Sequence, residues 1–316
     1  MFWQEAFLVA DGNMTLKRLT TFLVLMLTLA PVVVVAQEFS PRAYWPTPVG
    51  TRLLISGYSH SSGDVLLDPT IPIYGVDSRI STLFLGYMQT FALAGRNANL
   101  VLEAPYSWGV TRGLLDDTQA SKHVAGFNDL AATLSVNLLG APAMSREDFQ
   151  QLRAEPRPIV GVSFKLAPPT GHYKSDRFIN VGSNRWAGRL QFGAIFPLRP
   201  RWLLELDAGF WMFSDDADYP GGRREQDPIY AFEAHLVHRF RPGLWISLDM
   251  NRFTGGQQTI DGEKREDLQK NVRLGVTFAV PFLGRHAVKF GFSTAARTRR
   301  GSDSEQFLVS YNLLLQ

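Results

Sequence analysis

From about residue 50 onward the chain repeats one unit, a segment of about ten residues in which apolar and polar side chains alternate. The segment 202–212 shows this most clearly. Because successive side chains of a β-strand point to opposite faces, Glu205 and Asp207 lie at the centre of one face. The opposite face is apolar and consists of Trp202, Leu204, Leu206, Ala208, Phe210 and Met212. The same division recurs in 129–138, 244–251 and 271–280, and this pattern is typical of transmembrane barrel strands.

Alternation alone also fits a soluble sandwich, so two further features are needed. Single charges of both signs fall in mid-strand on the polar face, as expected for an enclosed lumen in which charges pair. These candidate residues of the lumen and substrate path are Glu103, Asp129, Lys165, Arg189, Glu205, Asp207, Glu233, Arg239, Asp249, Arg273 and Lys289. Short turns such as 199–201 also alternate with long loops such as 214–227, which is the rule for outer-membrane barrels.

We therefore predict an all-β fold, a closed antiparallel transmembrane β-barrel of about twelve strands over 50–316. Closure would satisfy every backbone group in lipid, and it would stabilise a chain that has no cysteine. An even number of strands would place both termini of this multi-pass protein in the periplasm of a Gram-negative bacterium. The expected strands are 50–60, 78–92, 98–110, 124–139, 158–168, 187–197, 202–213, 229–240, 244–254, 270–282, 286–298 and 304–315.

The N-terminus has the order of a cleaved secretory signal. Lys17 and Arg18 precede an apolar run, and Val34-Val35-Ala36 resembles a cleavage site. We predict a signal peptide over 1–36, with 1–13 as an upstream extension if Met14 is the start. A membrane-spanning helix is the alternative, although no anchoring positive cluster follows the run.

Two connecting segments carry further predictions. Residues 37–49 are expected to form a periplasmic N-terminal segment, with the alternative that the Pro-rich stretch Pro41 to Pro48 sits in the lumen as a small plug. Residues 143–155 are expected to form a short periplasmic helix, because Ser145 and Asp148 have the spacing of an N-terminal cap. Aromatic residues near strand ends fit interfacial girdles: Tyr44, Trp45 and Trp202 toward the periplasm, and Tyr106, Trp108, Trp186, Phe210 and Tyr230 toward the outside.

Three stretches resemble an outer-membrane transporter family named for the meta-pathway of phenol degradation. The stretches are Gly57 to Ile73, Asn137 to Pro142, and Ala167 to Trp186, which includes Ala-Pro-Pro-Thr-Gly-His-Tyr and Asn-Val-Gly-Ser-Asn-Arg-Trp. The resemblance implies an outer-membrane barrel, and the family name implies passage of aromatic or other small hydrophobic compounds. Its motif residues in the first and third outer loops either bind a ligand or pack over the mouth: Asp64, Asp68, Asp176, Asn180, Asn184, Arg185 and Trp186.

Enzyme chemistry has weak support in the sequence. His60 and Ser62 share one strand face, which is the geometry of a nucleophilic pair in a lipid hydrolase, but no third member is evident. His235 and His238 point to opposite faces, and we expect no catalytic residue, metal or cofactor. Asp215, Asp216 and Asp218 are interpreted as a solvated acidic loop rather than a calcium site.

Three functions remain compatible with the sequence. The first is a porin-like channel for passive passage of small, aromatic or hydrophobic molecules, and the others are a barrel enzyme and a closed structural or adhesive barrel. The expected partners are outer-membrane lipid, small-molecule solutes and the barrel-assembly machinery. A net charge of only +3, without a basic stripe, gives no support for nucleic-acid binding.

Overall fold

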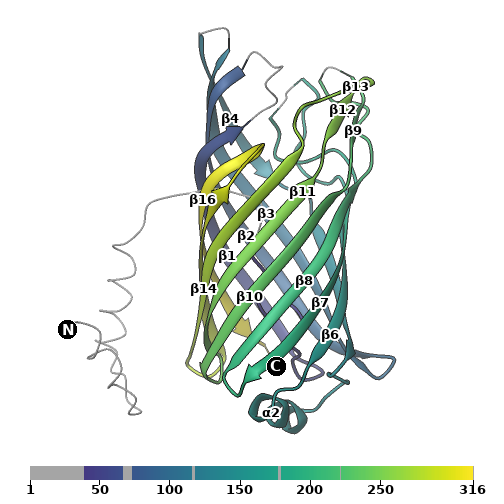
Figure 1. Cartoon of the computed structure of the whole chain (residues 1–316), viewed down its shortest axis with the longest axis vertical. Coiled ribbons are helices and arrows are strands. Elements are labelled where there is room, and N and C mark those ends of the chain that lie inside the picture. Colours follow the sequence, from purple (N-terminus) through teal and green to yellow (C-terminus); the bar gives the residue numbers. More distant parts are fainter. Residues whose placement is uncertain (1–38, 67–72, 116–117, 177–178, 221, 316) are drawn as a thin grey trace, which may run out of the picture. The chain divides into compact units, whose positions relative to one another are not determined.

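The computed structural model describes residues 39–66, 73–115, 118–176, 179–220 and 222–315, all of which belong to one compact unit. The expected signal peptide lies outside the described residues. The unit is a closed β-barrel with a short helix at one end (Figure 1). Within the described residues, no helix is both long and apolar enough to cross a membrane.

The wall of the barrel is one antiparallel sheet. Its strands are β1 (Arg52–Leu66), β2 (Ile73–Leu93), β3 (Arg96–Leu115), β4 (Thr118–Phe127), β5 (Ala131–Leu139), β6 (Ile159–Ala167), β7 (Ala187–Arg199), β8 (Trp202–Phe213), β10 (Ile229–Arg241), β11 (Leu244–Gly255), β14 (Gln269–Phe282), β15 (His286–Arg297) and β16 (Gly301–Leu314). Because β4 and β5 pair with successive parts of β3, they form one wall strand, and the ring has twelve. The pairings of β1 with β16 and of β2 with β3 close the ring.

The predicted strands are confirmed, with two corrections. β1 and β3 end five or six residues later than expected, and β2 and β4 begin five or six residues earlier. The expected strand 124–139 is interrupted at 128–130, so Asp129 lies between β4 and β5 instead of in mid-strand. Three short strands were not predicted: β9 (Arg224–Gln226), β12 (Gln258–Ile260) and β13 (Glu263–Lys264). They pair with one another in a small separate sheet, and their shortness leaves too few residues for an alternating pattern to be recognised.

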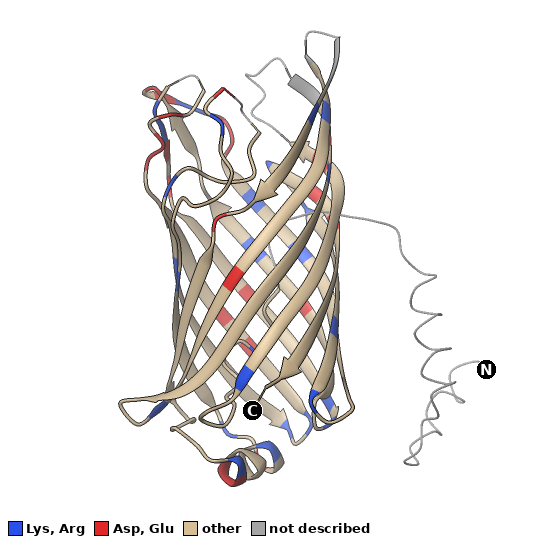
Figure 2. Ribbon diagram, turned by 180° about the vertical axis from the view of Figure 1, so that it is seen from behind, with Lys and Arg blue, Asp and Glu red and all other residues tan. Residues whose placement is uncertain are grey.

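The two faces of the wall differ as the alternation predicted. Large apolar side chains such as Leu85 and Leu248, each 60% exposed, point outward. Polar side chains such as Ser61, Asn251 and Thr277 point inward and are buried. An apolar outer face and a polar lumen are the arrangement of transmembrane barrels. Figure 2 shows single charged positions of both signs scattered along the strands.

The two ends of the barrel differ in their connections. We call one the α2 end, since it holds helix α2 (Arg146–Ala154) together with short turns such as Pro200-Arg201. Ser145 caps α2, with its hydroxyl and the carboxylate of Asp148 each accepting the other's backbone N–H, as the sequence predicted. We call the other the loop end, since it holds the long connections 168–186, 214–228 and 256–268.

Candidate functional site

The N-terminal segment lies inside the barrel at its α2 end. We call residues 39–49 the inner segment. The backbone N–H of Arg42 donates to Oε2 of Glu205 on β8 at 2.6 Å. The hydroxyl of Tyr44 lies 2.9 Å from Oγ of Ser163 and donates to the carbonyl of Gln191 at 3.2 Å. These contacts with β6, β7 and β8 favour the lumen plug over the expected position outside the barrel.

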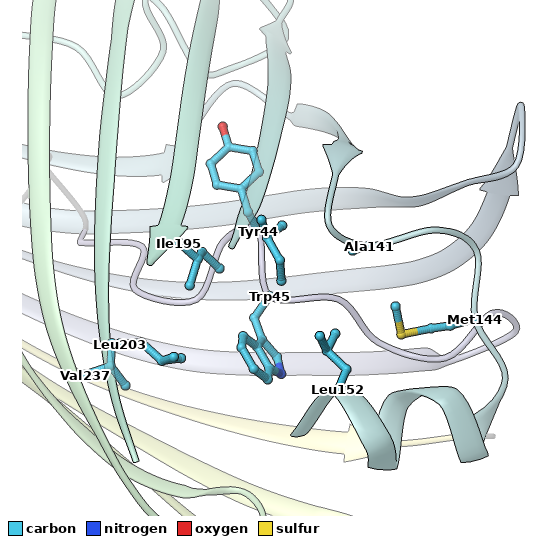
Figure 3. Packing of buried hydrophobic residues seen from close by; sticks show 9 residues of the cluster. Tyr44, Trp45, Ala141, Met144, Leu152, Ile195, Leu203 and Val237 are labelled. Atoms are coloured by element: carbon cyan, nitrogen blue, oxygen red, sulfur yellow. The ribbon is translucent and has the colours of Figure 1, made fainter. Parts of the chain in front are cut away.

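The girdle prediction for the first two aromatic residues is therefore wrong. Tyr44 points up into the lumen, and Trp45 lies between the barrel wall and Leu152 of α2 (Figure 3). Both side chains are more than nine-tenths buried. They pack in one apolar cluster with Ile159, Ile195, Leu203 and Val237, which point inward from the ends of four wall strands. The segment is difficult to place from sequence because three prolines hide any periodic pattern.

Glycines in the wall make room for the aromatic rings of the inner segment. A Cβ atom on Gly161 would lie 2.3 Å from the ring of Tyr44, and one on Gly193 would lie 2.1 Å from it. A Cβ atom on Gly275 would lie 2.7 Å from the ring of Phe39. Real Cβ atoms do not approach other atoms this closely, so these wall positions require glycine while the inner segment is in place.

Five of the predicted lumen charges meet on one side of the barrel, beside the inner segment. Arg189, Glu205, Asp207, Glu233 and Asp249 come from β7, β8, β10 and β11. The guanidinium of Arg189 forms an ion pair with Glu233 across the intervening strand. The four carboxylates are each at least 97% buried, and the alternating pattern alone could not show that they share one side.

The remaining lumen charges are dispersed. Lys165 forms an ion pair with Glu103, and Arg273 donates to the hydroxyls of Ser293 and Ser304. Lys289 lines a small cavity beside Phe39. Arg239 lies at the α2 end, where it donates to the carbonyls of Arg153 and Pro200. The wall formed by β16, β1 and β2 presents mainly buried hydroxyl and amide groups: Ser59, Ser61, Ser78, Ser304, Gln306 and Ser310.

A cavity of about 790 Å³ lies between the inner segment, α2 and the turns of the α2 end. Trp45, Phe149 and Trp245 supply aromatic surface, and five arginines supply positive charge. The guanidinium of Arg42 lies 4.3 Å from the ring centre of Trp45. The arginines are Arg42, Arg153, Arg201, Arg239 and Arg241. The cavity therefore combines the groups that bind an aromatic ring with those that bind an anion.

At the loop end, two carboxylates organise the long connections. Asp129 accepts hydrogen bonds from the backbone of Gly171 and from the backbone and hydroxyl of Ser183. It is a loop residue, and the prediction that it lies in mid-strand is wrong. Asp216 is 1% exposed and pairs with Arg224, so it is not part of a solvated acidic loop.

Most of the outer-loop motif residues serve the same architecture. The side-chain amide of Asn184 donates to Asp216. Buried Arg185 stacks on Phe213 and donates to the side chain of Gln226. The side-chain amide of Asn180 bonds both the backbone N–H and the carbonyl of Lys174. The backbone N–H of Trp186 donates to the hydroxyl of Ser214, and the residue is 51% exposed. Asp64 is exposed but lies on β1, so the prediction that it belongs to an outer loop is wrong. Asp176 is exposed, and Asp68 lies outside the described residues. Burial and the carboxylate of Asp216 raise the pKa of Tyr173 to about 12.

His60, the weakly supported candidate partner of Ser62 in a lipid hydrolase, bonds a serine of the neighbouring strand. Nδ1 of His60 lies 2.7 Å from the hydroxyl of Ser81 on β2. The same Ser81 hydroxyl also bonds the hydroxyl of Tyr58. His60 shares its face with outward-pointing Leu83 and Trp108, as the pairing of β1 with β2 and of β2 with β3 requires. These groups form part of an aromatic girdle at the loop end.

The model of the family described as "Putative MetA-pathway of phenol degradation" matches residues 55–310. The chain belongs to this family. Comparison with curated protein sequences gave no match. Among solved structures, an outer-membrane channel from Pseudomonas putida F1 is similar, with a TM-score of 0.71 and 22% identity over 88% of this chain and 100% of that one. The β-domain of the Bordetella autotransporter BrkA has a TM-score of 0.53 and 14% identity over 84% of this chain and 100% of that one.

The family match and the structure together confirm the closed barrel that the sequence predicted. The match begins within β1, so the inner segment lies before it. The position of this segment in the lumen therefore comes from its contacts with the wall, such as those of Arg42, Tyr44 and Phe39, and not from the family match.

Proposed function

We propose that this family member is an outer-membrane channel for passive passage of small molecules, with the inner segment as its constriction. The observation that carries the proposal is a closed ring whose apolar face points outward and whose polar lumen is narrowed by residues 39–49. The similarity to the Pseudomonas putida protein, which is described as an outer-membrane channel, adds support. The α2 end would face the periplasm, and the short turns at this end and the long connections at the other support this orientation.

The substrates that fit best are small aromatic molecules, including those with a negative charge. The family description supports this class, and so does the cavity at the α2 end. Phe149 and Trp245, which are both partly exposed, offer aromatic surface, while Arg153 and Arg201 offer donors to a carboxylate or phenolate oxygen. The charged residues of the lumen would then set selectivity along the path.

The direct test is conductance in planar bilayers. It compares the chain from Gln37 onward, without the predicted signal peptide and called the mature chain below, with a variant that also lacks residues 39–49. We expect low conductance in the complete chain and a clear rise when the segment is removed, because its rings fill the lumen at the α2 end. Flux of benzoate into liposomes, compared with a sugar of similar mass, tests the substrate class. Absence of conductance in both forms would contradict the channel and favour a closed structural barrel.

A further inference from the structure

The acidic side of the lumen contains a histidine in an unusual position. Glu205 on β8, His235 on β10 and Asp249 on β11 are direct cross-strand neighbours in one row. Asp207 and Glu233 face each other in the next row. His235 is fully buried, and both carboxylates of the second row are at least 97% buried. Like charges in this position repel each other, so the arrangement requires something that compensates them.

A hydrogen bond to Asp249 on the neighbouring strand fixes the orientation of the His235 ring. Its Nδ1 lies 2.8 Å from Oδ1 of Asp249, and the other oxygen of Asp249 accepts a hydrogen bond from Thr277 at 2.7 Å. We assign the proton of the neutral ring to Nδ1, because this nitrogen faces the carboxylate of Asp249. Nε2 then carries a free lone pair. A carboxylate that holds the far nitrogen in this way is the usual second partner of a metal-binding histidine.

On the other side of the ring, Nε2 of His235 and carboxylate oxygens of Asp207 and Glu233 lie near one another without forming hydrogen bonds between them. Nε2 of His235 and Oε2 of Glu233 are buried, have no hydrogen-bond partner, and lie 3.6 Å apart. Oδ2 of Asp207 lies 3.9 Å from the same Nε2, and a set of three ligand atoms fits within 4.8 Å. Ligands about 2.1 Å from a tetrahedral zinc ion lie about 3.4 Å from each other, so small side-chain movements would complete the geometry.

The local charges point in the same direction. The two rows hold the four carboxylates of Glu205, Asp207, Glu233 and Asp249. Arg189 pairs with Glu233, and Arg42 of the inner segment interacts electrostatically with Glu205. Four negative charges against these two positive ones leave two uncompensated negative charges when His235 is neutral. Buried charge without compensation is costly, and one divalent cation would neutralise both.

We propose that Asp207, Glu233 and His235 bind a divalent transition-metal ion in the lumen, beside the inner segment. One imidazole nitrogen with two carboxylate oxygens suits Zn²⁺ or Mn²⁺ better than Ca²⁺ or Mg²⁺, which prefer oxygen alone. Phe39 packs edge-on against His235, with ring centres 6.2 Å apart, and Tyr44 lies beside Gly193, the cross-strand neighbour of Asp207. The ion would therefore lie under the inner segment, and its binding does not depend on the proposed transport.

The test measures Zn²⁺ bound by the mature chain without a histidine tag. The protein is unfolded, stripped with EDTA, refolded in detergent with or without Zn²⁺, separated from free metal, and assayed for zinc by mass spectrometry. We expect about one zinc per chain in the parent. Asp207→Asn and His235→Gln each remove a ligand, so they should lose more affinity than the roughly 10- to 100-fold that is typical of a changed outer-shell partner. Asp249→Asn, which changes a positioning residue, should weaken binding to a smaller extent.

Two matched variants locate the binding. His238→Gln removes a histidine three residues along β10 on the opposite face, and Glu103→Gln removes a lumen carboxylate outside the cluster; both should bind zinc like the parent. The electrophoretic shift between unheated and heated samples shows that each variant has folded. The proposal is overturned if the folded parent retains no zinc, or if the control variants lose it as fully as Asp207→Asn. The cluster would then be an ion-pair network around a protonated histidine.

Discussion

Gly193 of β7 faces the ring of Tyr44 so closely that a Cβ atom at this position would lie 2.1 Å from the ring. The same atom would lie 2.2 Å from Oδ1 of Asp207. The position of the Tyr44 ring therefore requires a glycine at residue 193 of the wall. Because Gly193 has no Cβ atom, the ring of Tyr44 can lie against β7.

Gly193→Ala should displace the inner segment and raise conductance, because backbone atoms of a barrel strand cannot move away from the added methyl group. Gly188→Ala is the control on the same strand, since its Cβ atom would meet nothing closer than 3.7 Å. Single-channel recording in planar bilayers checks both variants. Equal conductance in Gly193→Ala, Gly188→Ala and the parent would contradict a constriction held by Tyr44.

Tyr44→Phe should loosen the inner segment without adding bulk. The variant loses the hydrogen bonds of the hydroxyl to Ser163 and Gln191. A net loss of about 1 kcal/mol would raise the ratio of open to closed channel about five-fold. The open fraction in single-channel records measures this ratio, and Tyr230→Phe, whose side chain is exposed on the outer face, is the control.

Lys165→Gln should shift ion selectivity toward cations. Lys165 and Glu103 pair in the lumen and are each about 30% exposed there, so removing the ammonium leaves an unpaired carboxylate along the path. Reversal potentials in a salt gradient measure the shift. Lys174→Gln, in an exposed part of the loop end, should leave the potential near that of the parent. A shift of the same size in both variants would place the path elsewhere.

Asp216→Ala should open the loop end to proteolysis. The carboxylate of Asp216 pairs with Arg224 and accepts from Tyr173 and Asn184, and breaking a buried pair costs about 3 kcal/mol. If this loss lowers the free energy of local opening of the loops, the opened form becomes more populated. Trypsin cleavage in the loop should then accelerate on the order of a hundred-fold. Asp215→Ala breaks an exposed pair with Arg223 and should change the rate little. Identical rates would show that Asp216 does not hold the loops together.

Acid should weaken the cap of helix α2. The backbone N–H and the hydroxyl of Ser145 lower the pKa of Asp148 below its usual 3.8. The ionised form therefore stabilises the cap above that value, and this stabilisation is lost as pH falls through the lowered pKa. Ser145→Ala removes the hydroxyl and should raise the pKa toward 3.8, whereas Ser145→Thr should not. Carbon NMR titration of the Asp148 carboxyl checks this, and an unchanged pKa in Ser145→Ala would refute it.

The sequence alone determined the long strands of the wall, their two faces and the capped helix. Alternation with period two shows which side of a strand meets lipid, and the expected strand 202–213 coincides with β8. Ser145 and Asp148 likewise act within one helical turn. Such features depend on neighbours in the chain, and local spacing is therefore enough to predict them.

Only the tertiary structure decided which distant residues meet. Strand register brings Asp207, Glu233 and His235 together, although Asp207 and Glu233 are 26 positions apart in the chain. Tyr44 reaches Ser163 and Gln191 through the lumen, and Asp129 leaves the wall to bond Ser183. The alternating pattern repeats every two residues in every strand, so it specifies a face but carries no information on which neighbour faces it.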